Sequence, residues 1–345
     1  MSKINISVIG CGGIGRVHLA ALAECSDEAV IAWTIDARAE TALAAAAAYG
    51  ARNCGTDYHS ALGPDTDAVI LCVPTYLHAE IAVAALEAGK HLFCEKPIAR
   101  TLQQAQAIRS ASRDSKSPTA IAFVRRFDDE WLAFRSAIQA GAIGAPVVWN
   151  DVVSFEGPGP AWYGQDELGG GPFLDGAIHT LDFALYTFGP AKSVYCAGGT
   201  RKAGNTAIDT GSATVKFVSG DVLLMAWSWG LPKGCAGARV FEFLGPEGII
   251  TWPNGVGAPP KPGAAEGEVE MRHFVIDRGS KQEAIYYPAA ALQWAYERQI
   301  REYLAVTRGK ALPRANVDDG YEALRLSLAI IESARTGRVI EFGEG

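Results

Sequence analysis

Residues 4–15 read INISVIGCGGIG, and this stretch decides the first half of the fold. The run 4–9 is mostly apolar and rich in isoleucine and valine, which predicts a buried strand. A G-x-G-x-x-G pattern, Gly10, Gly12 and Gly15, follows directly and leads into a helical pattern. In this order of strand, turn and helix, the pattern predicts the start of a dinucleotide-binding βαβ unit.

Each glycine of the turn has its own task. Gly10 permits the tight turn, Gly12 lets the backbone approach a pyrophosphate, and Gly15 allows the helix to pack closely on the strand. Together with Gly13 and Ile14 they form the predicted cofactor-binding turn. The helix that begins here offers its N–H groups and the positive end of its dipole to phosphate oxygens.

Asp36 ends the second predicted strand, where a carboxylate can accept hydrogen bonds from both hydroxyls of an adenosine ribose. The same carboxylate repels a 2′-phosphate, so the sequence predicts NAD as the cofactor. Arg38 leaves NADP use open, because a nearby arginine can accept that phosphate. An ordinary helix N-cap aspartate also fits at position 36.

Two patterns divide the chain. Residues 1–124 alternate short apolar strands with longer helical stretches, which predicts an α/β Rossmann domain with a doubly wound parallel sheet that binds NAD(P). Residues 125–345 contain longer strand runs between Gly, Pro and Asp turns, and they predict an α+β domain with an open, mostly antiparallel sheet.

The strand predicted at residues 222–229 is apolar on both faces. Leu223, Met225, Trp227 and Trp229 share one face, Val222, Leu224 and Ala226 share the other, and we expect one of the two faces to pack on helices. The other face is then available to a second subunit, so we expect a homodimer or a homotetramer. Farther on, the Gly/Pro/Ala-rich stretch 254–268 predicts a long loop.

Composition excludes several classes of partner. The 345 residues carry a net charge of -7 and contain no Lys/Arg block, so nucleic acid and anionic membranes are not the expected partners. The expected partner is a small molecule. Seven scattered cysteines without a Cys-x-x-Cys pair indicate a reducing compartment. Because neither a secretory leader nor a long apolar span is visible, we expect a cytoplasmic protein.

Polar residues follow two further strands of the first domain. Pro74 and His78 come after the fourth strand, and Glu95, Lys96 and Pro97 come after the fifth. In a parallel sheet both groups lie at the carboxyl edge, where ligands bind, so Lys96 is predicted to point into the cofactor crevice. The alternative for an isolated Glu-Lys-Pro is a surface turn with a solvated ion pair.

The stretch 169–189 holds a second candidate group. Three glycines and a proline precede a helical pattern in which Asp175 and His179 are four residues apart, and therefore on one face. A carboxylate beside an imidazole orients it as a proton acceptor near neutral pH. A purely structural pair and metal ligation are the alternatives. No metal site is predicted, because no third ligand stands at a suitable spacing.

Four segments together resemble a known family. The G-x-G-x-x-G turn, AALEAGKHLFCEKPIA, FVRRFD and GGGPFLDGAIHTLD occur in the order and at the separations that are typical of the Gfo/Idh/MocA oxidoreductases. This family includes inositol and glucose-fructose dehydrogenases. The resemblance covers nearly the whole chain, and it is specific for the family but not for the substrate.

The resemblance implies roles for individual residues. Lys96 reaches the substrate hydroxyl and the nicotinamide ribose, and the Lys96-Pro97 peptide is cis. Asp175 and His179 bind the sugar, with His179 as general base. Arg125 lines the substrate pocket instead of being a surface charge, and the second domain, residues 125–345, binds the substrate and forms the oligomer contact.

Other residues complete the predicted binding sites. The cofactor-binding set also includes Pro74, His78 and Glu95. Trp162 either stacks on the substrate or packs against the protein, and its position leaves both readings open.

The predicted activity is NAD-dependent hydride transfer from a secondary hydroxyl of a cyclitol or sugar to nicotinamide, an EC 1.1.1-type reaction. The partner is therefore a polyol or sugar. Two alternatives stay open. One is a non-catalytic, NAD-responsive sugar sensor, and the other is a glycoside-cleaving enzyme that recycles NAD.

Overall fold

The computed structural model describes residues 2–251, 271–289 and 292–343 and divides the chain into two compact units. The first unit comprises Met1–Phe127 and Ala291–Leu324, and the second comprises Asp128–Ala290 and Arg325–Gly345. The sequence-based division has a single boundary after residue 124, whereas here a late segment returns to the first unit. Helical periodicity identifies an apolar face but not the sheet that will cover it. The loop predicted at 254–268 lies outside the described residues.

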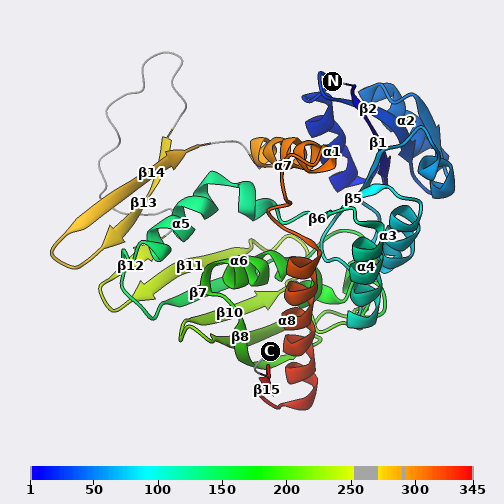
Figure 1. Cartoon of the computed structure of the whole chain (residues 1–345). Coiled ribbons are helices and arrows are strands. Elements are labelled where there is room, and N and C mark those ends of the chain that lie inside the picture. The colour runs from blue at the N-terminus through cyan, green and yellow to red at the C-terminus, as the bar shows by residue number, and fades with distance from the viewer. Residues whose placement is uncertain (1, 252–270, 290–291, 344–345) are drawn as a thin grey trace. The chain divides into compact units, whose positions relative to one another are not determined.

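A six-stranded sheet forms the centre of the first unit within the described residues (Figure 1). The strand order is β3-β2-β1-β4-β5-β6, and all neighbouring strands are parallel. This confirms the predicted doubly wound Rossmann sheet, whose order reverses between β1 and β4. Its elements are β1 (Ile4–Ile9), α1 (Gly13–Ala23), β2 (Ala29–Ile35), α2 (Ala39–Tyr49), β3 (Asn53–Gly55), β4 (Ala68–Leu71), α3 (His78–Glu87), β5 (His91–Cys94), α4 (Leu102–Ser115), β6 (Thr119–Ile121) and α7 (Leu292–Thr307).

The late segment joins this core through α7. Ile300, Tyr303 and Leu304 are almost fully buried in the same apolar cluster as Ile6 and Val8 of β1. The Tyr303 hydroxyl also donates a hydrogen bond to the Val69 carbonyl at 3.2 Å, so its polar end is satisfied inside the core. The central strands are therefore covered on both faces, which explains why they are apolar throughout instead of alternating.

A nine-stranded sheet forms the second unit within the described ranges. Its order is β14-β13-β12-β11-β7-β10-β9-β8-β15; only β7 and β10 run parallel among its described pairs, which confirms the mostly antiparallel prediction. The division between the units falls within the last helix, α8. The elements are α5 (Asp129–Gln139), β7 (Val148–Ser154), α6 (Ile178–Phe188), β8 (Ala191–Gly199), β9 (Thr210–Phe217), β10 (Val222–Ser228), β11 (Ala238–Gly245), β12 (Gly248–Thr251), β13 (Met271–Asp277), β14 (Gln282–Pro288), α8 (Val317–Thr336) and β15 (Ile340–Glu341).

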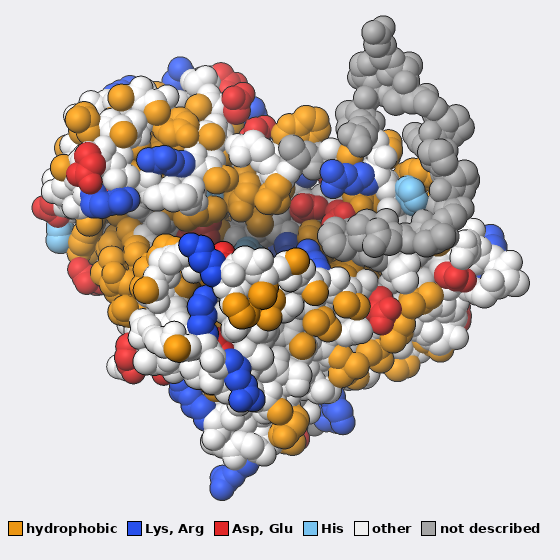
Figure 2. All heavy atoms as spheres, turned by 180° about the vertical axis from the view of Figure 1, so that it is seen from behind, with side chains coloured by type: hydrophobic (Ala, Val, Ile, Leu, Met, Phe, Trp, Pro, Cys, Tyr) orange, Lys and Arg blue, Asp and Glu red, His pale blue; other side chains and the backbone are white. Residues whose placement is uncertain are grey.

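The two faces of this second sheet have different environments. On the inner face, Trp149 of β7 packs edge-on against Trp131 of α5 and Phe183 of α6, with ring centroids 6.1 and 5.6 Å away. On the outer face, Leu224 and Val240 are 40% and 47% exposed. Figure 2 shows apolar side chains among charged and polar ones on the surface seen from behind. Residues 222–229 thus bury one apolar face, as predicted, and expose the other.

Candidate active site

The glycine turn between β1 and α1 is shaped by close packing at its two ends. Gly10 has a φ of +94°, and a Cβ atom there would lie 2.5 Å from the Cys72 carbonyl oxygen. A Cβ atom on Gly15 would lie 1.9 Å from the Gly10 carbonyl oxygen. By contrast, a Cβ atom on Gly12 or Gly13 would meet no described atom within 4 Å. The outer glycines are therefore needed for folding, while the middle ones leave the start of α1 open to a ligand.

Asp36 holds the end of β2 against this turn. Its carboxylate accepts hydrogen bonds from the backbone N–H groups of Cys11 and Arg38, both at 3.0 Å. The Arg38 side chain is 67% exposed, and its Nε lies 3.7 Å from the Asp36 carboxylate. Burial and the neighbouring Asp36 charge raise the pKa of the Cys11 thiol to about 12. The acid and the arginine that the sequence assigns to ribose recognition thus lie side by side at the carboxyl edge of the sheet.

Glu95 follows β5 at the same edge, and it is 5% exposed. Its Oε1 lies 2.8 Å from Nε2 of His18, a fully buried residue of α1. Its Oε2 accepts the backbone N–H of Lys96 at 3.0 Å. The acid in this motif is therefore not part of a solvated surface turn, because both of its oxygens have partners inside the first unit.

His78 connects the two strand ends that carry the predicted residues. Its Nδ1 lies 2.8 Å from the Pro97 carbonyl oxygen, and its Nε2 lies 2.9 Å from the Val73 carbonyl oxygen. Carbonyl oxygens only accept, so both contacts are hydrogen bonds when both ring nitrogens carry protons. Pro74 directly follows Val73 and precedes a short 3-10 turn. The Lys96-Pro97 peptide is cis, as the resemblance implied. His78 thus positions the segment that presents Lys96.

The glycine-rich stretch of the second unit differs from the straight helix that the sequence predicts. Residues Pro172–Gly176 form a π-helical turn, closed by a 2.7 Å hydrogen bond from the Ala177 N–H to the Pro172 carbonyl, and α6 begins only at Ile178. Asp175 therefore lies in the π turn, and His179 lies in the first turn of α6. The single helix predicted here is therefore a π turn followed by α6, because the hydrogen bond of a π turn spans one more residue than that of an α-helix.

The turn and α6 are anchored by polar contacts to the rest of the second unit. Thr180, which follows His179, donates its hydroxyl to the buried Asp151 carboxylate of β7 at 2.8 Å. Ser327 of α8 donates its hydroxyl to the Phe173 carbonyl at 2.7 Å. Asp175 is 9% exposed. Asp175 and His179 are thus held in a segment whose backbone is fixed on both sides.

Two other predicted side chains have neighbours that bear on their roles. Trp162 stacks on Tyr163, with ring centroids 3.7 Å apart. Arg125 is partly buried, whereas the adjacent Arg126 is 3% exposed. Arg126 donates to the Arg314 carbonyl at 2.7 Å and to Asp319 at 3.0 Å. Of the two arginines, Arg126 therefore has a structural role within the first unit.

Sequence reasoning missed His18. It is three residues after Gly15, on the first helix, and its partner Glu95 is distant in the chain. The available signal was a histidine in an otherwise apolar helix face beside a motif that buries an acid. Local patterns do not reveal such a pairing, because it depends on how α1 packs over β5.

In comparisons with known proteins, segments of both units match domain models of the same oxidoreductase family. A model described as oxidoreductase family, NAD-binding Rossmann fold, matches residues 4–123, and a GFO/IDH/MocA C-terminal domain model matches residues 131–251. The Thermotoga maritima myo-inositol 2-dehydrogenase is 27% identical, covering 99% of both chains. The Escherichia coli D-glucoside 3-dehydrogenase is 27% identical, covering 99% of this chain and 98% of its own. A levoglucosan dehydrogenase structure with NADH and L-sorbose is 25% identical, with a TM-score of 0.83 and 99% coverage of both chains.

Proposed function

Because this chain belongs to the Gfo/Idh/MocA oxidoreductase family and its first domain is an NAD-binding Rossmann domain, we propose that it oxidises a secondary hydroxyl of a cyclitol or sugar. The observation that carries the proposal is the ordered segment at Lys96. Glu95 and His78 fix this segment at the carboxyl edge of the sheet, where ligands of such folds bind. An amine held there is suited to stabilise negative charge on a substrate oxygen.

The glycine turn fits a dinucleotide. The open space at Gly12 and Gly13 lets backbone N–H groups of the turn, including that of Ile14, approach phosphate oxygens. We expect Asp36 to accept hydrogen bonds from the adenosine ribose. When bound, NAD supplies the carbon that accepts a hydride. The exposed Arg38 offers a partner for a 2′-phosphate, so we expect weaker use of NADP.

The polar residues divide the proton chemistry. As the substrate carbon loses hydride and its C–O bond becomes a carbonyl, the hydroxyl proton passes to His179. Lys96 stabilises the alkoxide that develops on that oxygen. Asp175 orients the imidazole or binds a neighbouring hydroxyl, and Arg125 contacts the polyol. Glu95 orients Lys96 by accepting its backbone N–H, and we assign it no contact with the substrate because it is only 5% exposed.

An absorbance screen at the NADH band tests the proposal. Inositols and common sugars are supplied with NAD or NADP in parallel. We expect Lys96→Ala and His179→Ala each to lower turnover by at least about a hundredfold, the scale of general acid-base catalysis and alkoxide stabilisation. Near-normal rates in both variants would contradict the assigned roles. NAD binding without reduction by any polyol would favour a sensor instead.

We also propose that the outer face of the nine-stranded sheet pairs with a second copy of the chain. Leu224 of β10 and Val240 and Leu244 of β11 are exposed, and the strand register places them on one face of the sheet, with β7 between the two strands. Burying such side chains between two sheets is favourable at about 25 cal/mol per Å² of apolar area. Light scattering of Leu224→Lys and Val240→Lys should show monomers. An unchanged assembly in both variants would exclude this face.

A cytoplasmic location is proposed from the cysteines. All seven are free thiols, and five of them are buried. Free thiols persist in reducing compartments. In the described part of the chain, no helix has the length and apolar composition that crossing a membrane requires. Cell fractionation with an antibody to the chain tests this location.

A further inference from the structure

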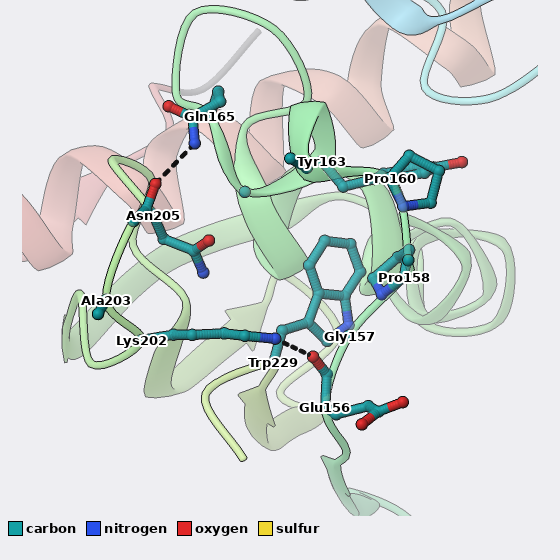
Figure 3. Close-up of a pocket in the computed structure, with 14 residues that line it drawn as sticks. Glu156, Gly157, Pro158, Pro160, Tyr163, Gln165, Lys202, Ala203, Asn205 and Trp229 are labelled. Carbon is teal, nitrogen blue, oxygen red and sulfur yellow. Dashed lines mark hydrogen bonds between the residues drawn. The ribbon is translucent and has the colours of Figure 1, made fainter. Parts of the chain in front are cut away.

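The second unit contains a pocket that no assigned residue explains. Its volume is about 260 Å³, and its walls come from the loop after β7, the turn at residues 161–164, the loop at 202–205 and Trp229 (Figure 3). Sites for drug-sized ligands span roughly 300–1,000 Å³, so this pocket has room for one small ring. In Figure 3 the Lys202 side chain runs toward the Glu156 carbonyl, and Asn205 and the Trp229 ring both lie above it in this view.

The pocket walls are held in place before any ligand binds. Asp209 is fully buried and accepts hydrogen bonds from the N–H of Lys202 at 2.8 Å and from the Asn205 side chain at 3.0 Å. The Gln165 amide donates to the Gly204 carbonyl at 2.8 Å, and Lys202 Nζ donates to the Glu156 carbonyl at 2.6 Å. These bonds tie the two loops together, so binding requires little ordering of the protein.

The composition of the pocket matches a sugar ring. Trp229 and Tyr163 contribute aromatic surface, with ring centroids 6.1 Å apart and planes at 90°. Asn205, Gln165 and Lys202 contribute amide and ammonium groups around it. A pyranose has an apolar C–H face and a rim of hydroxyls. An aromatic wall with a few polar groups therefore meets both of its surfaces.

Trp229 also connects the pocket with the segment that carries Asp175. A Cβ atom on Gly157, in the pocket wall, would lie 2.9 Å from the Trp229 Cβ. A Cβ atom on Gly176 would lie 2.9 Å from the far edge of the same indole ring. Gly176 directly follows Asp175 in the π turn. The Trp229 side chain thus reaches from the pocket wall to the residue that follows Asp175.

We propose that this pocket is a second carbohydrate subsite, so that the natural substrate is a two-ring glycoside. This inference rests on the proposed function: the ring to be oxidised lies at Asp175 and His179, and the ring linked to it by the glycosidic bond lies in the pocket. The bond between the rings is not broken. The second ring contributes binding and orientation, which raise kcat/KM without taking part in the proton transfer.

A pocket-filling variant tests the subsite. Gly159 lines the pocket, and a Cβ atom there would meet no described atom within 4 Å, so Gly159→Phe fills space without a backbone clash. Gly199→Phe is the matched control, because Gly199 also has open space and, at the end of β8, is not among the residues that line the pocket. Ala203→Phe is a second filling variant from the opposite loop.

The assay compares glucose and methyl glucoside with maltose, cellobiose, trehalose and sucrose, by NADH formation and by calorimetric binding to the full-length protein. We expect kcat/KM for the preferred two-ring sugar to be at least about tenfold higher than for its single-ring counterpart. A difference of this size corresponds to the binding energy of a few well-placed contacts. Gly159→Phe and Ala203→Phe should abolish that advantage while leaving the single-ring rate unchanged. Gly199→Phe should preserve it.

The outcomes separate the two proposals. If single rings and two-ring sugars react and bind equally well, or if the filling variants lower both rates alike, the subsite is refuted while the dehydrogenase stands. If a two-ring sugar binds and the filling variants abolish its binding, but no sugar is ever oxidised, the subsite holds and the proposed activity fails. If no two-ring sugar binds at millimolar concentration, the subsite is refuted outright.

Discussion

Replacing the buried His18 by alanine should strongly destabilise the first unit. The His18 and Glu95 side chains are 0% and 7% exposed, and the two are 2.8 Å apart. Removal of the imidazole leaves a buried carboxylate with the Lys96 N–H as its remaining described hydrogen-bond donor. Breaking a buried pair in this way costs about 3 to 5 kcal/mol. For a unit of this size, that lowers the Tm by about 10 °C.

The chain offers a matched control for this prediction. His59 and Asp57 form a similar pair at 2.9 Å, but their side chains are 67% and 65% exposed. We therefore expect His59→Ala to leave the unfolding midpoint unchanged, because an exposed pair is screened by water. Urea unfolding followed by circular dichroism compares the two variants. Equal midpoints for His18→Ala and His59→Ala would refute the buried-pair reasoning.

A conservative variant separates packing from positioning. His18 also packs edge-on against Phe93, with ring centroids 5.1 Å apart, and alanine removes this contact as well. His18→Gln keeps an amide donor for Glu95 at a similar reach. If the pair positions Lys96, His18→Gln should restore kcat more fully than it restores stability, since the amide replaces the hydrogen bond but not the ring. Recovery of stability without recovery of kcat would contradict the positioning role.

Three further predictions concern single side chains. Asp36→Ser should raise kcat/KM for NADP relative to NAD by at least about tenfold in steady-state kinetics, because the carboxylate that repels a 2′-phosphate is removed. Burial raises the pKa of Asp128, the N-cap of α5, so the folded state favours its protonated carboxyl. The stability that this protonation contributes is lost as the pH rises through the raised pKa. In urea unfolding at pH 7, Asp128→Asn should therefore be at least as stable as the wild type, because asparagine keeps the cap without the buried charge. Asp128→Ala loses the cap, which costs about 1 kcal/mol of stability. In acid, the stability difference between Asp128→Asn and the wild type should shrink. Iodoacetamide at pH 8 followed by mass spectrometry should label the exposed Cys54 and Cys235 and spare Cys11, whose raised pKa leaves roughly one thiol in ten thousand ionised.

The parts of the fold that sequence predicted correctly depend on local geometry. The glycine turn is an example: the steric demands at Gly10 and Gly15 arise from atoms a few residues or one strand away, and only glycine meets them. The parallel sheet followed in the same way from short apolar strands that alternate with helices. The alternation of strands and helices is repeated along residues 1–124, so an error in one predicted element does not change the predicted fold.

The errors and omissions have physical reasons. A π turn at 172–176 has the same residue types as an α-helical start, because its hydrogen bond merely skips one more residue. The return of α7 to the first unit is decided by which sheet accepts its apolar face. The pocket beside Trp229 is assembled from three separated segments, and the hydrogen bonds that join them leave no periodic pattern.

Both units fix their polar loops with a buried acid. Glu95 accepts the Lys96 N–H, and Asp209 accepts the N–H groups of Arg201 and Lys202, each at 2.8 Å. An acid is costly to bury unless its oxygens are occupied, and here each acid accepts backbone N–H groups of the loop that carries the candidate residues. The bonds that offset the burial of charge therefore also set the course of the backbone. It follows that a chain with the same apolar pattern but without these two acids would keep both sheets and lose the placement of Lys96 and the shape of the pocket.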